Sequence, residues 1–220
     1  MISSSHSRGA IRRAALSMAA VLRTPIPVLL TALLGASLGL GGCSILPDNE
    51  PIHLVDPRLE VEPGLHGASR TWTLNIARPE TDPVRDSSRV LVRTPDGQLQ
   101  VHPTARWVAP APELVRTALV RYLRDAELLA QVGASASGSD RTLVIDLRRF
   151  EIARDPSGSL AVVARADARL YDSASADRVS RLSFDHAEAI ESASVAEVVR
   201  GTQAVLAFLA RRTGDWLAEI

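Results

Sequence analysis

The sequence predicts an α+β fold in which two helices pack on a largely antiparallel sheet. Several segments carry apolar residues at every second position, which is typical of half-buried strands. Two longer segments repeat apolar residues at spacings of three and four, which is typical of amphipathic helices. With 220 residues, 46% of them hydrophobic, the chain is long enough to bury the core that such a domain needs.

The first half of the domain is expected to contain a strand, a hairpin and a helix. Residues 71–76 alternate polar with apolar side chains, which predicts a strand. The segments 89–93 and 98–102 flank the sequence TPDG, which predicts a hairpin turn. Two prolines then open an amphipathic helix that we expect at 110–132.

The second half is expected to contain three consecutive strands. The first begins at Thr142, and its alternation shifts near residues 148–149, as a β-bulge would produce. The sequence DPSG at 155–158 predicts a type I turn. The segment 160–170 shows the clearest alternation in the chain, and 179–187 predicts the third strand.

The last element is expected to be a helix that begins at a capping box. In Ser194-Val195-Ala196-Glu197 the hydroxyl and the carboxylate can satisfy free backbone amides reciprocally. The helix carries an apolar stripe that is expected to be core, although a stripe wider than the sheet beneath it would seat a subunit or an acyl chain. The predicted stripe consists of Val195, Val199, Thr202, Leu206, Leu209 and Trp216.

Residues 1–42 have the pattern of a secretory signal peptide. Arginines precede the apolar run 27–40, which is shorter than the roughly 20 residues of a membrane-spanning helix, and two glycines close it. The chain's single cysteine follows, and the stretch Leu40–Cys43, LGGC, resembles the lipobox of bacterial lipoproteins. An uncleaved anchor helix and a twin-arginine signal at Arg12-Arg13 are the alternatives. Translation starts at Met1 or at Met18.

The lipobox implies that Cys43 is the lipidation site, which carries a covalent diacylglycerol and a further acyl chain. Such a cysteine becomes the new N-terminus, and two or more acyl chains give stable membrane attachment. Residues 43–51 then form the lipidated tether, and eight extended residues after Cys43 reach about 28 Å. Position 44 is Ser rather than the Asp that retains some lipoproteins at the inner membrane, which favours the outer membrane.

Composition and spacing argue against nucleic-acid binding and against most kinds of catalysis. All 25 basic residues are arginines, and without residues 1–42 the acidic residues outnumber the basic ones, whereas nucleic-acid binding needs a basic face. A chain without lysine has no P-loop, and its histidines lack the spacing of a metal site. His186 lies near Asp185 and Glu188, but neighbours on a strand point to opposite faces. We therefore expect no enzyme activity, catalytic residue, metal or cofactor. The histidines are His6, His53, His66, His102 and His186.

One face of the predicted sheet is charged. Arg165, Asp167 and Arg169 share this face and are expected to pair with Arg181 or Asp185 of a neighbouring strand. A solvated surface is one interpretation of the face, and a docking surface is the other.

The segment 89–114, RVLVRTPDGQLQVHPTARWVAPAPEL, resembles the auxiliary lipoproteins of ABC-type transporters, the DUF330-type family that contains paraquat-inducible protein C. In that family a strand, a turn, a second strand and an Arg-Trp pair, here Arg106-Trp107, lead through prolines into the first helix. The resemblance covers the domain 52–220 in element order, starting with a strand at 52–57. Ile52-His53 and Val101-His102 replace aromatic residues that are frequent in the family.

The resemblance implies a non-catalytic outer-membrane lipoprotein that faces the periplasm and serves lipid transport between the two membranes. Its partners would be an ABC permease, an ATPase and a periplasmic protein with mammalian-cell-entry domains, and it would form a homo-oligomer. Only Cys43 carries over as a functional residue, with Trp107 as a structural landmark. The alternatives are a lipoprotein for envelope assembly or activation of a peptidoglycan synthase, and a periplasmic lipid carrier.

Overall fold

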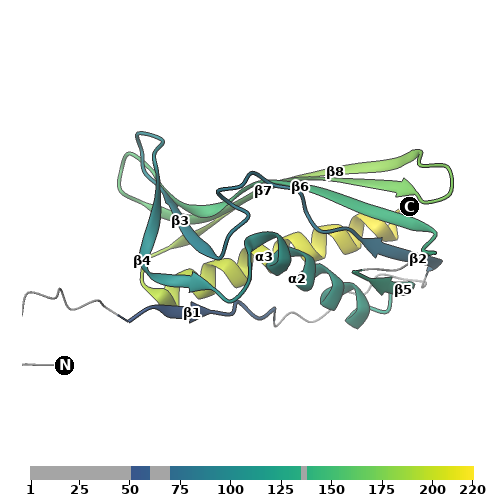
Figure 1. The fold of residues 1–220 in the computed structure, drawn as a ribbon, viewed down its shortest axis with the longest axis horizontal. Helices are drawn as coiled ribbons and strands as arrows, with labels where there is room; N and C mark the ends of the chain where they lie inside the picture. The colour runs from purple at the N-terminus through teal and green to yellow at the C-terminus, as the bar shows by residue number, and fades with distance from the viewer. Residues whose placement is uncertain (1–50, 60–69, 135–137) are drawn as a thin grey trace, which may run out of the picture. The chain divides into compact units, whose positions relative to one another are not determined.

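A computed structural model describes residues 51–59, 70–134 and 138–220, and within them it has one eight-stranded sheet and two helices (Figure 1). The predicted α+β class is confirmed. The predicted signal peptide, the predicted lipidation site Cys43 and the predicted tether up to residue 50 lie outside the described residues. The elements are β1 (His53–Val55), β2 (Arg70–Ile76), β3 (Arg89–Arg93), β4 (Leu99–Trp107), α2 (Ala111–Asp125), β5 (Leu129–Gly133), β6 (Arg141–Arg154), β7 (Leu160–Asp172), β8 (Arg178–Ile190) and α3 (Val195–Ala218).

The sheet is organised around β6. On one edge β6 pairs with β7 along its whole length, and β7 pairs with β8, both antiparallel. On its other edge β6 pairs in parallel with β2 near its start and with β3 near its end. The predicted hairpin of β3 and β4 and the bulge between Leu147 and Arg149 are both confirmed. The long ladders are thus antiparallel, while β1 and β5 add short parallel ladders to β4 and β2.

The segment between β2 and β3 follows the edge of β6. Glu80 accepts a hydrogen bond from the Leu147 amide and donates one to the Ile145 carbonyl, both at 2.8 Å. The Thr81 hydroxyl donates to the Leu147 carbonyl at 2.6 Å. These bonds satisfy backbone groups of β6 between its two parallel partners, and they fix the course of the segment that carries Arg85.

The predicted extension of the first helix to Val132 is wrong. α2 ends at Asp125, and Glu127 takes a φ of 49°, a left-handed conformation that ends the helical path. The following residues form β5, which pairs in parallel with β2 from Leu129 to Gly133. Leu129 and Val132 are apolar and buried in either arrangement, so the pattern of hydrophobic residues does not distinguish them. Its pairing with β2 therefore determines that this segment is a strand and not a continuation of the helix.

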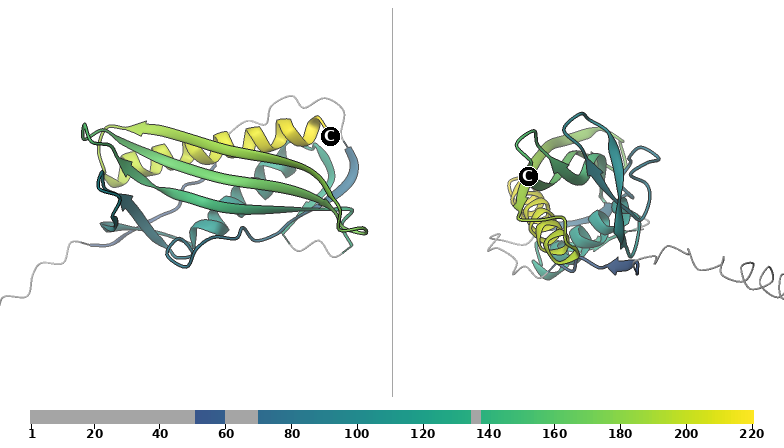
Figure 2. Two further views of the ribbon diagram at one scale, coloured as in Figure 1. Left: turned by 90° about the horizontal axis from the view of Figure 1, so that it is seen from above. Right: turned by 90° about the vertical axis from the view of Figure 1, so that its left-hand side faces the viewer.

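α3 packs on the inner face of β7 and β8 (Figure 2). Small side chains on β7, among them Ala164 and Ala166, let the helix approach closely. At Gly201 a Cβ atom would lie 2.7 Å from the Cγ2 atoms of Val162 and Ile190, so only glycine fits there. The apolar stripe of α3 therefore lies in the core, as predicted, and α2 packs beside it.

The capping box at the start of α3 is confirmed on one side and differs on the other. The Ser194 hydroxyl accepts from the Glu197 amide at 3.4 Å. The Glu197 carboxylate accepts from the amide of Glu191 at 2.9 Å rather than from that of Ser194. The carboxylate thus ties the end of the β8 segment to the first turn of the helix.

Candidate docking surface

The first strand of the described domain is β1. This strand pairs in parallel with β4, with His53 opposite Ala105 and Val55 opposite Trp107. Trp107 is buried, and its ring lies 5.8 Å from that of Phe150, so it has the structural role expected of it. No helix in the described ranges is both long and apolar enough to cross a bilayer.

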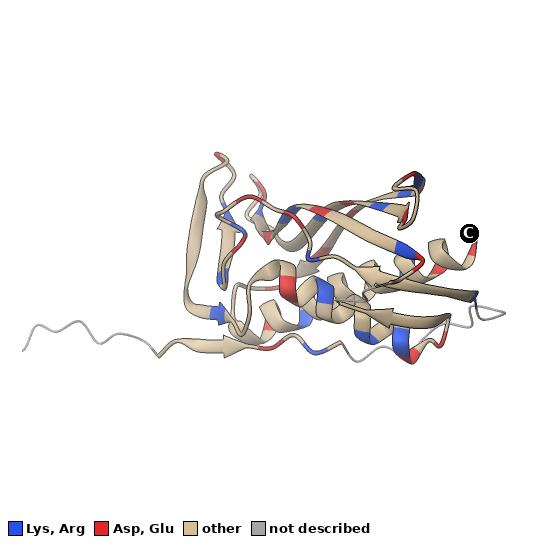
Figure 3. Ribbon diagram, turned by 45° about the vertical axis from the view of Figure 1, so that its right-hand side comes forward, with Lys and Arg blue, Asp and Glu red and all other residues tan. Residues whose placement is uncertain are grey.

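Charged residues recur along β6, β7 and β8 (Figure 3), and the strand register places them on the face opposite α3, which we call the arginine face. Its residues alternate along each strand with the buried ones that contact α3, and the strand register brings them together across the sheet. The arginine face consists of Asp146, Arg148, Arg149, Glu151, Arg165, Asp167, Arg169, Arg178, Arg181 and Asp185.

The pairings predicted for this face are confirmed in part. Arg165 binds Asp185 across the strands, with Nε 3.0 Å from Oδ2. Asp167 binds Arg148 and also accepts a hydrogen bond of 2.6 Å from the Ser183 hydroxyl. Arg169 lies directly opposite Arg181, so these two cannot pair with each other.

One carboxylate on the arginine face is fully buried, and three arginines surround it. We call Glu151, Arg85, Arg93 and Arg149 the Glu151 cluster. The Glu151 side chain has 0% exposure, and it accepts from Arg85 at 2.6 Å, from Arg93 at 2.5 Å and from Arg149 at 3.0 Å. Burial raises the pKa of Glu151, but the hydrogen bonds from these arginines outweigh it and hold the pKa below its usual value.

The Glu151 cluster is not among the features that the sequence predicts. Glu151 stands between the inward-facing Phe150 and Ile152, where strand alternation predicts an exposed side chain. Its partners Arg85 and Arg93 come from 66 and 58 residues away, on segments whose position along β6 is set by the parallel pairings. The local sequence contains no signal of this burial.

A second group of arginines lies near the turn between β7 and β8, and we call Arg169, Arg178 and Arg181 the open arginine cluster. Within the described part of the chain, none of the three forms an ion pair or a hydrogen bond. They line a cavity of about 260 Å³ together with Arg148, Asp146 and Asp167. This end of the face therefore carries an excess of positive charge, because its two carboxylates bind Arg148 and Ser183 instead of these three arginines.

His102 and His186 have structural roles in the fold. His186 stacks on Phe208 of α3, with ring centroids 4.0 Å apart, and Asp185 lies on the opposite face of the sheet, as predicted. His102 is buried, and its Nδ1 accepts from the Ala105 amide at 3.0 Å. Its Nε2 therefore carries the proton and donates to the Ala193 carbonyl at 2.6 Å, which ties β4 to the segment before α3.

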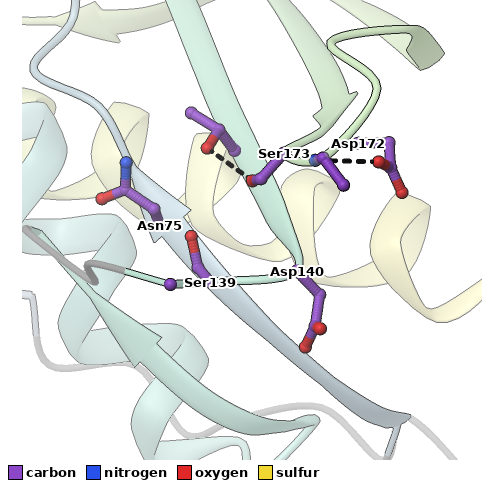
Figure 4. Close-up of a pocket in the computed structure, with 8 residues that line it drawn as sticks. Asn75, Ser139, Asp140, Asp172 and Ser173 are labelled. Carbon is purple, nitrogen blue, oxygen red and sulfur yellow. Dashed lines mark hydrogen bonds between the residues drawn. The ribbon is translucent and has the colours of Figure 1, made fainter.

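A polar hollow of about 570 Å³ lies where β6 begins and β7 ends (Figure 4). Asp140 accepts from the Thr73 amide and hydroxyl at 2.8 and 2.9 Å, and Asp172 accepts from two amides of the following turn at 3.0 Å. Figure 4 shows that these two carboxylates do not converge. These hydrogen bonds lower the pKa values of Asp140 and Asp172. Because each carboxylate is bound within its own loop, we interpret the hollow as a junction between loops. Among the residues described, no group of three acidic, His or Cys side chains is placed to hold a metal ion.

Comparison with known proteins agrees with this fold. The model of the ABC-type transport auxiliary lipoprotein component family matches residues 58–213. The crystal structure of protein XCC0632 from Xanthomonas campestris, a DUF330 protein, is similar with a TM-score of 0.72 and 28% identity, covering 76% of this chain and 95% of that one. The structure of an uncharacterized protein shares the fold with a TM-score of 0.53 and 18% identity, covering 69% of this chain and 93% of that one.

No curated protein sequence matches the chain. The family model, however, spans nearly all of the described domain, from the residues after β1 to the last turns of α3. The chain therefore belongs to the family of ABC-type transport auxiliary lipoprotein components.

Proposed function

We propose that the protein is a non-enzymatic outer-membrane lipoprotein that serves as the auxiliary component of an ABC-type lipid transport system. The family match over residues 58–213 carries this proposal, because the family is described by that auxiliary role. Its partners in the proposal are a periplasmic protein with mammalian-cell-entry domains, an ABC permease and an ATPase. The protein itself would act as a homo-oligomer that supports the integrity of the envelope.

Attachment to the membrane is assigned to Cys43 in this proposal. The LGGC motif at 40–43 supports lipidation of this cysteine, and Ser44 supports the outer membrane as its location. A tether at 43–51 would hold the domain 52–220 within about 28 Å of that membrane. Contact with an inner-membrane permease would therefore need a partner that spans the periplasm.

The arginine face is the surface that we assign to the partner protein. Its pairs lie on the longest strands of the sheet, so they are held on a rigid support, and rigid surfaces lose less entropy on binding. Exposed charges also steer association with a partner of opposite sign. These properties suit a binding component better than the polar hollow, whose carboxylates are engaged in local hydrogen bonds.

Photo-crosslinking in intact envelopes tests the proposal. The chain has no lysine, so amine-reactive reagents have no side chain to attack, and a photoreactive residue must be introduced. Ala187 is exposed and lies two residues beyond Asp185 on the same side of β8, so it borders the arginine face. Arg211, which is exposed on α3, is the matched control position. We expect crosslinks to a mammalian-cell-entry protein from position 187, with the permease and ATPase recovered in the same complex.

Two outcomes would contradict this function. One is recovery of a peptidoglycan synthase in place of a transporter component. The other is recovery of no transporter component while a known envelope complex survives the same purification. The variant Cys43→Ser tests the anchor separately, because it should move the protein from the membrane fraction to the soluble fraction. An unchanged membrane fraction would contradict lipidation at Cys43.

A further inference from the structure

The open arginine cluster brings like charges together on neighbouring strands. Arg169 and Arg181 are directly opposite in the β7–β8 register, and such residues have Cβ atoms about 4.5–5.5 Å apart. Arg178 lies opposite Tyr171, on the same side of the cavity. Like charges in this arrangement destabilise a sheet unless an anion lies between them.

The carboxylates in the cavity are engaged elsewhere. Asp146 accepts from Arg148 Nε at 3.3 Å, and Asp167 binds both Arg148 and the Ser183 hydroxyl. The three arginines of the open cluster are therefore left without a counter-ion within the described part of the chain. In addition, the Nε atom of Arg169 is buried and has no hydrogen-bond acceptor there. A buried donor without an acceptor is costly, and an acceptor supplied by a ligand would remove that cost.

We propose that the open arginine cluster binds the phosphate group of a phosphate monoester. Four arginines and two aspartates line the cavity, which leaves two positive charges to be balanced. A phosphate monoester carries about −1.5 to −2 charges at pH 7, whereas a single carboxylate carries one. Guanidinium groups also bind phosphate oxygens in pairs of parallel hydrogen bonds. A cavity of about 260 Å³ has room for this group and a small part of the molecule that carries it.

The proposal does not depend on a transporter partner, and calorimetry on the purified full chain tests it. The protein is kept in a non-ionic sugar detergent, which adds no phosphate, and titrated with inorganic phosphate and with glycerol 3-phosphate. We expect one site per chain, with dimethyl phosphate, a diester, binding more weakly. The substitutions Arg169→Gln and Arg181→Gln should each weaken binding about tenfold or more, the usual effect of losing a charged hydrogen bond.

The matched control is Arg154→Gln, which makes the same change of charge at the opposite end of β6. Its affinity for phosphate should stay close to that of the unmodified protein. Thermal unfolding confirms that each variant is folded, and Arg181→Gln is expected to fold because it removes a like-charge contact. No binding of any monoester, or equal affinity in all variants, would overturn the proposal.

Two further titrations identify the source of the phosphate. Phosphatidic acid in the same micelles presents the group on a lipid, and glycerol 3-phosphate presents it in solution. Tighter binding of phosphatidic acid would support a lipid ligand, and tighter or equal binding of glycerol 3-phosphate would support a soluble one. A glutamate-rich peptide that binds in preference to every phosphate probe would instead assign the cluster to an acidic protein and overturn the proposal.

Discussion

Two groups of three arginines lie on the same face of the same sheet, and they differ in their counter-charge. In the Glu151 cluster, Arg85, Arg93 and Arg149 converge on one buried carboxylate. In the open arginine cluster no carboxylate in the described ranges takes that place. The number of arginines is the same, so the position of the acid distinguishes a structural cluster from a candidate binding site.

The two clusters also differ in what they connect. The Glu151 cluster joins β6 to β3 and to the segment before it, which are distant in sequence. The open arginine cluster comes from β7 and β8, which are already joined by a continuous antiparallel ladder. The first cluster therefore contributes to the fold, whereas the sheet does not need the second.

The largest expected effect comes from removing the buried carboxylate. Glu151→Ala removes the buried acid that Arg85, Arg93 and Arg149 share and leaves Arg85 with only the half-exposed Asp82. Breaking a buried ion pair typically costs about 3–5 kcal/mol of stability. Denaturant unfolding at neutral pH measures this loss. A loss of stability as small as that expected for a surface ion pair would show that the Glu151 cluster does not stabilise the fold. The two arginine clusters would then not differ in their structural role.

Glu151 should make the stability of the folded protein depend on pH in the acidic range. The pKa of Glu151 is lower in the folded than in the unfolded protein, so its contribution to stability is fully present above the unfolded value of about 4.5. The contribution is lost as the pH falls from there through the folded value. Measured between pH 7 and pH 3, the unmodified protein should lose more stability than Glu151→Gln. Parallel curves for the two proteins would contradict this role.

A third change would give the open arginine cluster an acid of its own. Arg181→Glu places a carboxylate opposite Arg169, which replaces a like-charge pair by an ion pair. We expect a gain in stability of about 0.2–1 kcal/mol and loss of phosphate binding. Thermal unfolding and calorimetry on the same sample measure both. A loss of stability would show that the two arginines do not repel each other in the folded protein.

The smallest effect on stability is expected from a substitution at Arg165, which lies on the arginine face between the two clusters. Arg165→Gln removes the ion pair with Asp185, whose side chains are 51% and 58% exposed. Exposed pairs contribute little because water and salt screen them. We expect no measurable change in the unfolding midpoint and no change in phosphate affinity. A clear loss of stability would remove the distinction between paired surface arginines and the Glu151 cluster.

Features that depend on neighbouring residues could be predicted from the sequence. The β3–β4 hairpin, the bulge in β6 and the cap at Ser194 each have a signal within a few residues, and the structure has all three. The Arg165–Asp185 pair could also be anticipated, because a short turn limits the register of β7 and β8. These features need no knowledge of the rest of the fold.

Features that depend on distant segments could not be predicted. The sequence predicts a helix where β5 lies, because the apolar residues of this segment suit either element and its partner β2 is more than 50 residues away. The burial of Glu151 depends on arginines that the parallel ladders bring over β6. The lack of a counter-ion at Arg169 likewise depends on the pairing of neighbouring strands, because the nearby Asp167 binds Arg148 and Ser183 instead.

The unequal separation of paired strands has a consequence for the rate of folding. The strands β6, β7 and β8 are joined by short turns, so their ladders close small loops and can form early. β1 and β2 pair with strands about 50 residues or more further along the chain. Closing these long loops costs conformational entropy before the contacts of the paired strands can stabilise them, so these ladders are expected to form later. The arginine face would then be assembled first, and the N-terminal strand β1 would be among the last parts to become ordered.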